Sequence, residues 1–173
     1  MNTAPMRTHR DFPVVGIGAS AGGLEAVRSF LEAIPGDVGM AFVLIMHLSP
    51  ERESRLSEVL QTISEMPVIE VKDAVEVESD HVYVISPGRA LTLKNGRLVP
   101  IDTTRGKKPQ HSQAVIDRFF RALADQWRER SVGIVLSGTG TDGTLGIRAI
   151  REANGLTMAQ APAEAQFHAM PAS

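Results

Sequence analysis

The chain has 173 residues, of which 43% are hydrophobic and 22% are charged, a balance typical of one globular domain with a well-buried core. Its 18 Lys and Arg against 20 Asp and Glu give a net charge of −2, which excludes a broad nucleic-acid-binding surface. The absence of cysteine excludes a disulfide framework and a thiolate metal site, and no apolar run approaches the ~20 residues of a membrane-spanning helix. The first 12 residues are polar and contain no signal peptide, so the chain is expected to be cytoplasmic.

A glycine-rich stretch from Pro13 to Leu24 opens the domain, and residues 1–12 before it are expected to form a flexible tail. Its β-branched residues predict a buried strand, and the apolar residues that follow predict a helix beginning near Ser20 or Ala21. The buried stripe of this helix is expected to contain Leu24, Val27, Leu31 and Ile34.

Three interpretations of this stretch are open. In the first, Ser20 is a helix N-cap and the glycines only form the turn. In the second, Gly16-x-Gly18-x-x-Ala21 is a dinucleotide-binding fingerprint. In the third, Gly18-x-Ser20-x-Gly22 holds a serine nucleophile on a strand-to-helix turn. The stretch alone does not choose among them.

The middle of the chain alternates strands and helices. The apolar run at residues 40–46 is typical of a strand covered on both faces of a parallel sheet, and it ends at His47. Ser49-Pro50-Glu51 predicts the start of a helix with a buried stripe of Leu56, Val59, Leu60 and Ile63. Residues 67–71 and 81–85 are predicted strands, residues 91–99 a hairpin with Asn95-Gly96 in a type I′ turn, and residues 102–112 a basic loop.

The last third predicts a helix, a strand, a glycine-rich loop at residues 137–143, a helix at 145–152 that ends at Asn154-Gly155, and a strand at 156–159. The buried stripe of the first of these helices is Ile116, Phe119, Phe120, Leu123 and Trp127. The whole alternation predicts an α/β fold with a doubly wound, mainly parallel sheet and a small β-hairpin insertion.

Ligands of such sheets bind beyond the carboxyl ends of the strands, so the residues that follow each strand are the candidate site. A dinucleotide site needs an acidic residue after the second strand, but His47 stands there, which excludes that interpretation. Ser20, His47 and Asp142 all follow strands, and together they form a set able to activate a serine: an imidazole removes the hydroxyl proton and a carboxylate orients the imidazole. Taken singly, each has a structural alternative: for His47 it is a cap on a carbonyl at the strand end, and for Asp142 it is the N-cap of the helix that follows it. No H-E-x-x-H spacing and no G-K-S/T motif occurs, so neither a metal nor a cofactor is expected.

Three motifs resemble those of the catalytic domain of CheB, the chemotaxis protein-glutamate methylesterase, and the likeness extends over residues 13–173. They are Gly16-Ile17-Gly18-Ala19-Ser20-Ala21-Gly22-Gly23, Met46-His47, and Leu136-Ser137-Gly138-Thr139-Gly140-Thr141-Asp142-Gly143. The last of them is most similar to versions fused to CheR-type methyltransferases. The family commonly has threonine in place of Ala21 and methionine in place of Thr139.

The resemblance implies that Ser20 is the nucleophile, His47 the base and Asp142 the orienting acid, with oxyanion and substrate-binding N–H groups at Ala21, Gly22, Gly138 and Thr139. It implies demethylation of glutamate γ-methyl esters, and deamidation of glutamine, on a chemoreceptor or a similar signalling protein. The expected partners are that methylated protein and a CheR-type methyltransferase or sensor domain in the same polypeptide, with no nucleic acid and no membrane insertion. The methylesterase domain is expected to span residues 13–173 and to lack its C-terminal end. The alternative is a catalytically silent CheB-like binding or regulatory domain of a larger sensor protein.

Overall fold

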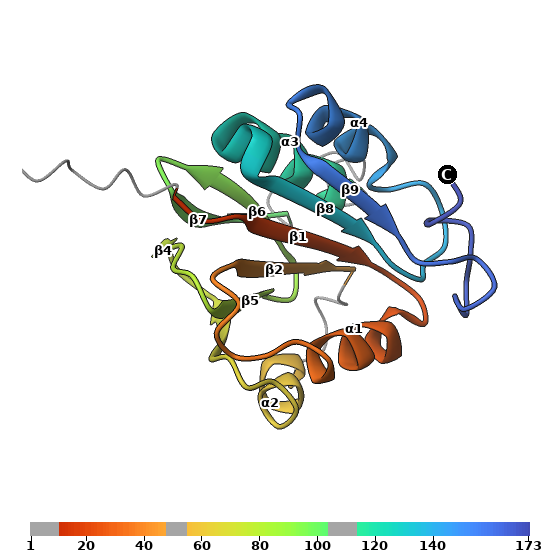
Figure 1. The fold of residues 1–173 in the computed structure, drawn as a ribbon, viewed down its shortest axis with the longest axis horizontal. Helices are drawn as coiled ribbons and strands as arrows, with labels where there is room; N and C mark the ends of the chain where they lie inside the picture. The colour runs from red at the N-terminus through yellow and green to blue at the C-terminus, as the bar shows by residue number, and fades with distance from the viewer. Residues whose placement is uncertain (1–10, 48–54, 104–113) are drawn as a thin grey trace, which may run out of the picture.

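The structure is a computed structural model that describes residues 11–47, 55–103 and 114–173. In these stretches a six-stranded sheet lies between two pairs of helices, with α3 and α4 on one face and α1 and α2 on the other (Figure 1). The strands of this sheet are β1 (Val14–Ala19), β2 (Ala41–Met46), β3 (Val68–Val71), β5 (His81–Ile85), β8 (Ser131–Val135) and β9 (Leu156–Ala159). The helices are α1 (Gly23–Glu32), α2 (Leu56–Gln61), α3 (Val115–Trp127), which runs into a 3₁₀ turn (Arg128–Arg130), and α4 (Thr144–Glu152).

The strands of the large sheet lie in the order β3-β5-β2-β1-β8-β9, and every neighbouring pair is parallel. The chain starts in the middle, at β1, builds outward through β2, and later returns to add β8 and β9 on the other side. The order of winding therefore reverses between β1 and β8, and the crevice at such a point is where open α/β sheets bind ligands. The predicted doubly wound parallel sheet is confirmed.

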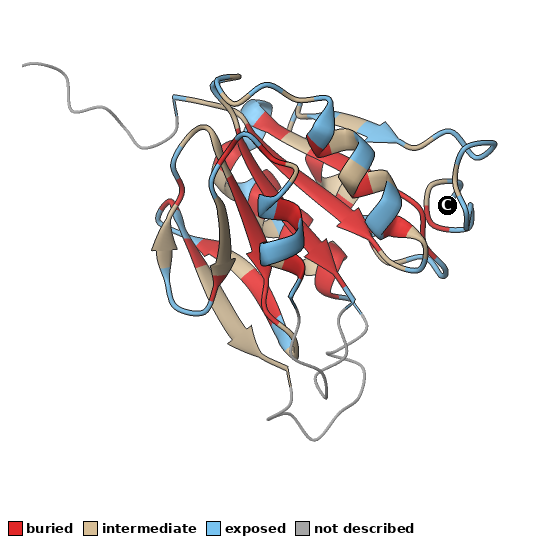
Figure 2. Cartoon of the chain, turned by 90° about the horizontal axis from the view of Figure 1, so that it is seen from below, coloured by how far each residue is buried: buried red, intermediate tan, exposed pale blue. Residues whose placement is uncertain are grey.

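Strand β2 shows why the sequence folds this way. Its six residues are all buried, and alternate side chains enter different cores: Ala41, Val43 and Ile45 pack on the side of α3, whereas Phe42, Leu44 and Met46 pack on the side of α1 and α2. A strand covered on both faces must be apolar throughout, which is the uninterrupted pattern of the sequence. Figure 2 shows the same burial along the neighbouring strands.

A small antiparallel sheet with the order β4-β7-β6 packs beside the large one. Its strands are β4 (Val75–Glu76), β6 (Arg89–Lys94) and β7 (Arg97–Asp102). Asn95 and Gly96 have φ values of 52° and 78°, the left-handed conformation at both central positions that a type I′ turn requires, so the hairpin prediction is confirmed. The two-residue strand β4 was not predicted, since it is too short to carry a periodic pattern.

Some predicted boundaries and burials differ from the structure. The first helix begins at Gly23, because Gly22 takes a left-handed conformation (φ 71°) and stands at the N-cap position in place of Ser20. Leu24 and Val59 were expected to be buried but are exposed, because each lies outside the face that its short helix turns toward the sheet. The predicted helix start at residues 49–51 and residues 104–112 of the predicted basic loop lie outside the described residues; Asp102, which the prediction placed in that loop, is the last residue of β7. Residues 1–10 of the predicted tail also lie outside the described residues, whereas Phe12 packs against the core.

Candidate active site

Ser20 and His47 follow two strands that are paired to their last residues. The register of β1 and β2 joins Ala19 to Met46, so the next residue of each chain segment emerges at the same place on the carboxyl edge of the sheet. The backbone of Ser20 is held on both sides: its N–H donates to Ser137 O at 3.0 Å, and its carbonyl accepts from Gly23 N at 2.9 Å. Ser20 Oγ makes no hydrogen bond to any described residue, and the residue is half-buried.

His47 and Asp142 form a hydrogen bond at this edge, with His47 Nε2 3.0 Å from Asp142 Oδ2. Because an ionised carboxylate only accepts, Nε2 carries the hydrogen of this bond. In the neutral ring that leaves Nδ1 with a free lone pair, which is the state of a general base. The imidazole is 33% exposed and the carboxylate 8% exposed, so the base faces the surface and the acid lies behind it.

The carboxylate of Asp142 is fixed by the start of α3. Its Oδ2 accepts from Ile116 N at 3.0 Å and its Oδ1 from Asp117 N at 2.9 Å. Asp142 is thus a helix cap as well as the partner of His47. It caps α3, however, and not the following helix α4, which the structural alternative for this residue had assumed.

The loop after β8 brings a third element to the site. A Cβ atom placed on Gly138 would lie 2.9 Å from Ser20 Cβ and would overlap Met170, so only glycine lets the loop approach the serine this closely. The carboxyl ends of β1, β2 and β8 therefore gather Ser20, His47 and Asp142 on one edge of the sheet.

The expected oxyanion donors are only partly available. The N–H groups of Ala21, Gly22 and Thr139 donate to no described residue, so they are free to bind a developing negative charge. The N–H of Gly138 already donates to Phe167 O at 3.0 Å, which removes it from the set that the sequence suggested.

Ser137 joins the serine loop to the C-terminal segment, a role that the sequence reasoning missed. Its buried hydroxyl donates to Ala21 O at 3.0 Å and accepts from Phe167 N at 2.9 Å. Its N–H donates to Gln160 Oε1 at 2.8 Å, and its carbonyl holds Ser20. The only sequence signal was the polar residue itself at the end of an apolar strand.

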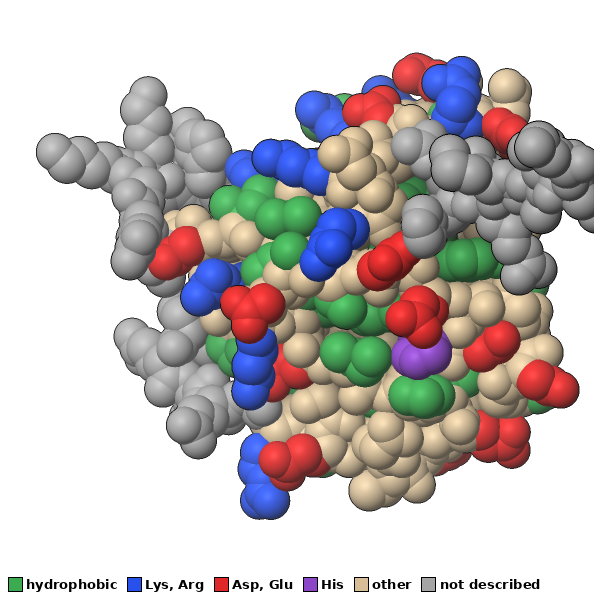
Figure 3. Space-filling view, turned by 90° about the vertical axis from the view of Figure 1, so that its left-hand side faces the viewer, with side chains coloured by type: hydrophobic (Ala, Val, Ile, Leu, Met, Phe, Trp, Pro, Cys, Tyr) green, Lys and Arg blue, Asp and Glu red, His purple; other side chains and the backbone are tan. Residues whose placement is uncertain are grey.

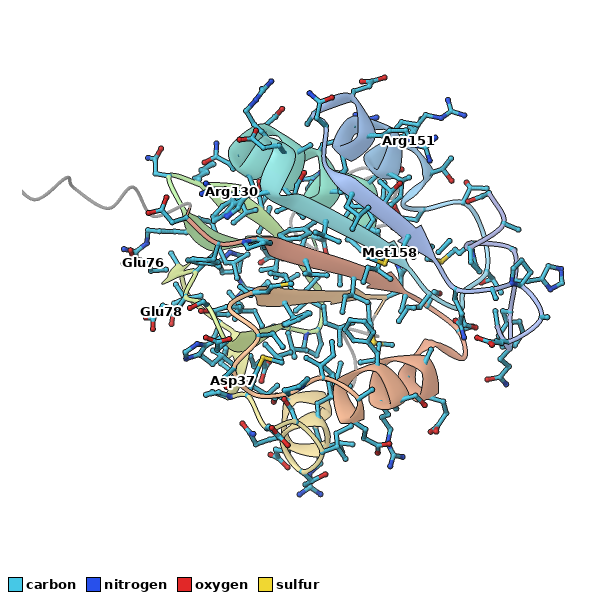
Figure 4. All side chains as sticks on the ribbon, in the orientation of Figure 1. Asp37, Glu76, Glu78, Arg130, Arg151 and Met158 are labelled. Carbon is cyan, nitrogen blue, oxygen red and sulfur yellow. The ribbon has the colours of Figure 1, made fainter. Side chains whose placement is uncertain are left out.

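A cavity of about 370 Å³ lies near this edge, between α4, β9 and the C-terminal segment. It is lined by Arg151 and Met158, which Figure 4 labels on α4 and β9, and by Met170, but not by Ser20, His47 or Asp142.

Within the described residues, no group of three or more His, Asp or Glu could hold a metal ion, and no helix is long and apolar enough to cross a membrane. The amino-end face of the sheet, opposite the site, carries acidic and basic side chains mixed with hydrophobic ones (Figure 3).

A doubly wound α/β domain with a serine next to a hydrogen-bonded His–Asp pair at its strand ends has the framework of a serine hydrolase. A model of the CheB methylesterase family matches residues 15–173, and the chain belongs to this family.

Known proteins agree with this assignment. The chain is 34% identical over 169 residues to a Bordetella avium protein named protein-glutamate methylesterase/protein-glutamine glutaminase 1; the match covers 98% of this chain and 49% of that protein. It is 38% identical over 120 residues to an uncharacterized 104.1 kDa protein of Rhodobacter capsulatus, covering 68% of this chain and 12% of that protein. The crystal structure of the Thermotoga maritima CheB methylesterase catalytic domain superposes with a TM-score of 0.81 at 26% identity, covering 94% of this chain and 87% of the other. The chain thus spans about half of the Bordetella protein and a small part of the Rhodobacter one.

Proposed function

We propose that this chain is a protein-glutamate methylesterase that hydrolyses γ-methyl esters of glutamate through Ser20, His47 and Asp142. The observation that carries the proposal is the 3.0 Å hydrogen bond between His47 and Asp142. The register of β1 and β2 places Ser20 beside His47 at the same strand ends. The family membership supports the same reaction class.

In the proposed reaction, His47 Nδ1 takes the proton of the Ser20 hydroxyl as Oγ attacks the ester carbonyl. Asp142 keeps the hydrogen on Nε2 and stabilises the imidazolium that forms. The tetrahedral intermediate collapses, the imidazolium gives its proton to the departing methanol, and a glutamyl ester of Ser20 remains. Water, deprotonated by the same imidazole, then releases glutamate and restores the serine.

The negative charge of the tetrahedral intermediate requires donors that are fixed before the reaction starts. The free N–H groups of Ala21 and Gly22 on one loop, and of Thr139 on the other, fit this role. All three are backbone groups, so the departures from the common family motif at Ala21 and Thr139 leave these donors in place.

The substrate we propose is a methylated chemoreceptor or a similar signalling protein, which would be met in the cytoplasm. The name of the Bordetella relative includes glutaminase activity, and deamidation needs only ammonia in place of methanol as the leaving group. The greater length of both relatives supports a place for this domain in a larger polypeptide, for which a CheR-type methyltransferase or a sensor domain is our proposal.

A fluorophosphonate probe, which modifies activated serines, tests the proposal. We expect covalent labelling of the folded protein, with the adduct located by mass spectrometry on the peptide that contains Ser20, and no labelling after denaturation. Folded protein that stays unlabelled would instead support the catalytically silent alternative.

A further inference from the structure

Helices α3 and α4 begin side by side at the active-site edge, and the residue at each N-cap position makes no side-chain hydrogen bond within the described part of the chain. The N-cap positions are Ala114 for α3 and Gly143 for α4. The first N–H groups of a helix have no intrahelical partner, so these two helix starts need acceptors from elsewhere.

The start of each helix receives its hydrogen-bond acceptor from an aspartate at or just before the start of the other helix. Asp142, in the loop before α4, accepts from Ile116 N and Asp117 N at the start of α3. Asp117, in the first turn of α3, accepts through Oδ1 from Gly143 N at 3.1 Å and Gly146 N at 2.6 Å at the start of α4. The two carboxylates thus cap the helices crosswise.

Close packing of the helices makes this exchange possible. A Cβ atom on Gly146 would overlap Phe120 Cβ and lie 3.2 Å from Asp117 Cα, so glycine is required for α4 to approach α3 this closely. Gly143 has a φ of 102°, a conformation that other residues rarely adopt, and its N–H is one of the two that Asp117 holds.

We propose that Asp117 is a positioning residue for the reaction: by binding the N–H of Gly143, it fixes the residue next to Asp142 and so holds the Asp142 carboxylate in reach of His47. This inference rests on the proposed function of Ser20, His47 and Asp142. Asp117 contacts neither His47 nor Ser20 among the described residues, so its effect on turnover passes through Asp142.

Two substitutions separate this role from the charge of Asp117. Both capping bonds use a single oxygen, Oδ1, so the carbonyl of asparagine replaces it in Asp117→Asn, whereas Asp117→Ala removes it. We expect Asp117→Ala to lower kcat by about 10²-fold, the scale of a misplacement of about 1 Å, with KM unchanged. Asp117→Asn is expected to retain kcat within about threefold, which is less than 1 kcal/mol in the barrier.

Two control variants test whether the loss of a carboxylate from α3, or a loss of stability, is enough to lower kcat. Asp125→Ala removes an exposed carboxylate from the same helix and is expected to leave kcat unchanged. Asp80→Ala removes the acceptor of Gly39 N at the opposite edge of the sheet, so it is expected to lower the melting temperature without changing kcat measured well below that temperature.

The final readout does not depend on activity. The proton between His47 Nε2 and Asp142 gives a downfield ¹H NMR signal, which we expect in wild type, Asp117→Asn and Asp80→Ala and expect to be lost or shifted in folded Asp117→Ala. Retention of both the signal and kcat in Asp117→Ala would overturn the inference, as would an Asp117→Asn variant as impaired as Asp117→Ala. A wild-type protein that shows the signal but has no esterase activity would instead refute the proposed function.

Discussion

Asp142, the acid of the proposed catalytic triad, and Ser20, its nucleophile, are held by different kinds of contact. At the acid end, the side chain of Asp142 is nearly buried and bound by Ile116 N, Asp117 N and His47 Nε2. At the nucleophile end, hydrogen bonds fix the backbone of Ser20, while its Oγ makes none with the described residues. The fold therefore fixes the position of the acid by hydrogen bonds and leaves the serine hydroxyl without one to the described residues.

This difference separates activity from stability. A substitution at the free hydroxyl should remove the chemistry without cost to the fold, because no described group depends on it. A substitution at the bound carboxylate should affect both, because the backbone donors Ile116 N and Asp117 N depend on its oxygens. The predictions below test this contrast, from the largest expected effect to the smallest.

Ser20→Ala is expected to abolish ester hydrolysis, since the attacking atom is lost. The free energy of unfolding should stay within about 0.5 kcal/mol of wild type, as for a substitution that breaks no contact. Chemical denaturation and hydrolysis of a small ester measure the two quantities. A large loss of stability would show that the hydroxyl has a structural partner and would break the contrast.

Asp142→Asn is expected to lower turnover by up to ~10⁴, the loss that follows when a triad carboxylate becomes an amide and the imidazole takes the wrong tautomer. Both oxygens of Asp142 accept N–H groups, so the amide nitrogen of asparagine must face one of these donors. We therefore expect a loss of about 1–3 kcal/mol in the free energy of unfolding as well. Turnover close to that of wild type would leave Asp142 with the capping role alone.

Gly138→Ala should impair the serine end through its surroundings, because the added methyl group would overlap Met170 and crowd Ser20 Cβ. We expect turnover to fall by about 10²-fold and stability by about 1–3 kcal/mol. Gly39→Ala is the control: its strain comes from a positive φ (70°) and not from overlap, because the added Cβ meets no atom within 4 Å, and it lies at the far edge of the sheet. Equal turnover losses in the two variants would show that general strain, and not crowding of Ser20, is the cause.

Ser137→Ala is expected to have the smallest effect on catalysis. It removes the hydroxyl that joins Ala21 O to Phe167 N but keeps the carbonyl that binds Ser20 N. Stability should fall by about 0.5–1.5 kcal/mol for each of the two hydrogen bonds lost, and turnover by less than about tenfold. A turnover loss as large as that of Gly138→Ala would mean that the C-terminal segment itself orders the serine loop.

The candidate site could be predicted because the residues that follow parallel strands are set by the order of the strands along the chain. The apolar runs before Ser20 and His47 and before the loop of Asp142 marked three parallel strands, whose carboxyl ends must share an edge. The structure joins His47 to Asp142 by a hydrogen bond and places Ser20 and His47 after paired strand ends, while the catalytic roles of the three residues stay a prediction.

Contacts between distant segments could not be predicted in the same way. The acceptor of Gly138 N is Phe167, and the acceptor of Gly143 N is Asp117, in both cases more than 20 residues away and without a periodic signal. The start of α1 was missed for a local reason, since Gly22 and Gly23 both allow a turn and only one of them caps the helix. Propensity does not distinguish two adjacent glycines.

The most direct test of the account is release of methanol from a chemoreceptor fragment that carries radiolabelled γ-methyl glutamate. The wild-type chain is incubated with this fragment, beside the folded Ser20→Ala variant. We predict that the wild type releases labelled methanol and leaves a carboxylate at each methylated position, and that Ser20→Ala releases none. Equal release by the two proteins, or no release by folded wild type on a fragment that another methylesterase demethylates, would contradict the claim that Ser20 is the nucleophile of a methylesterase.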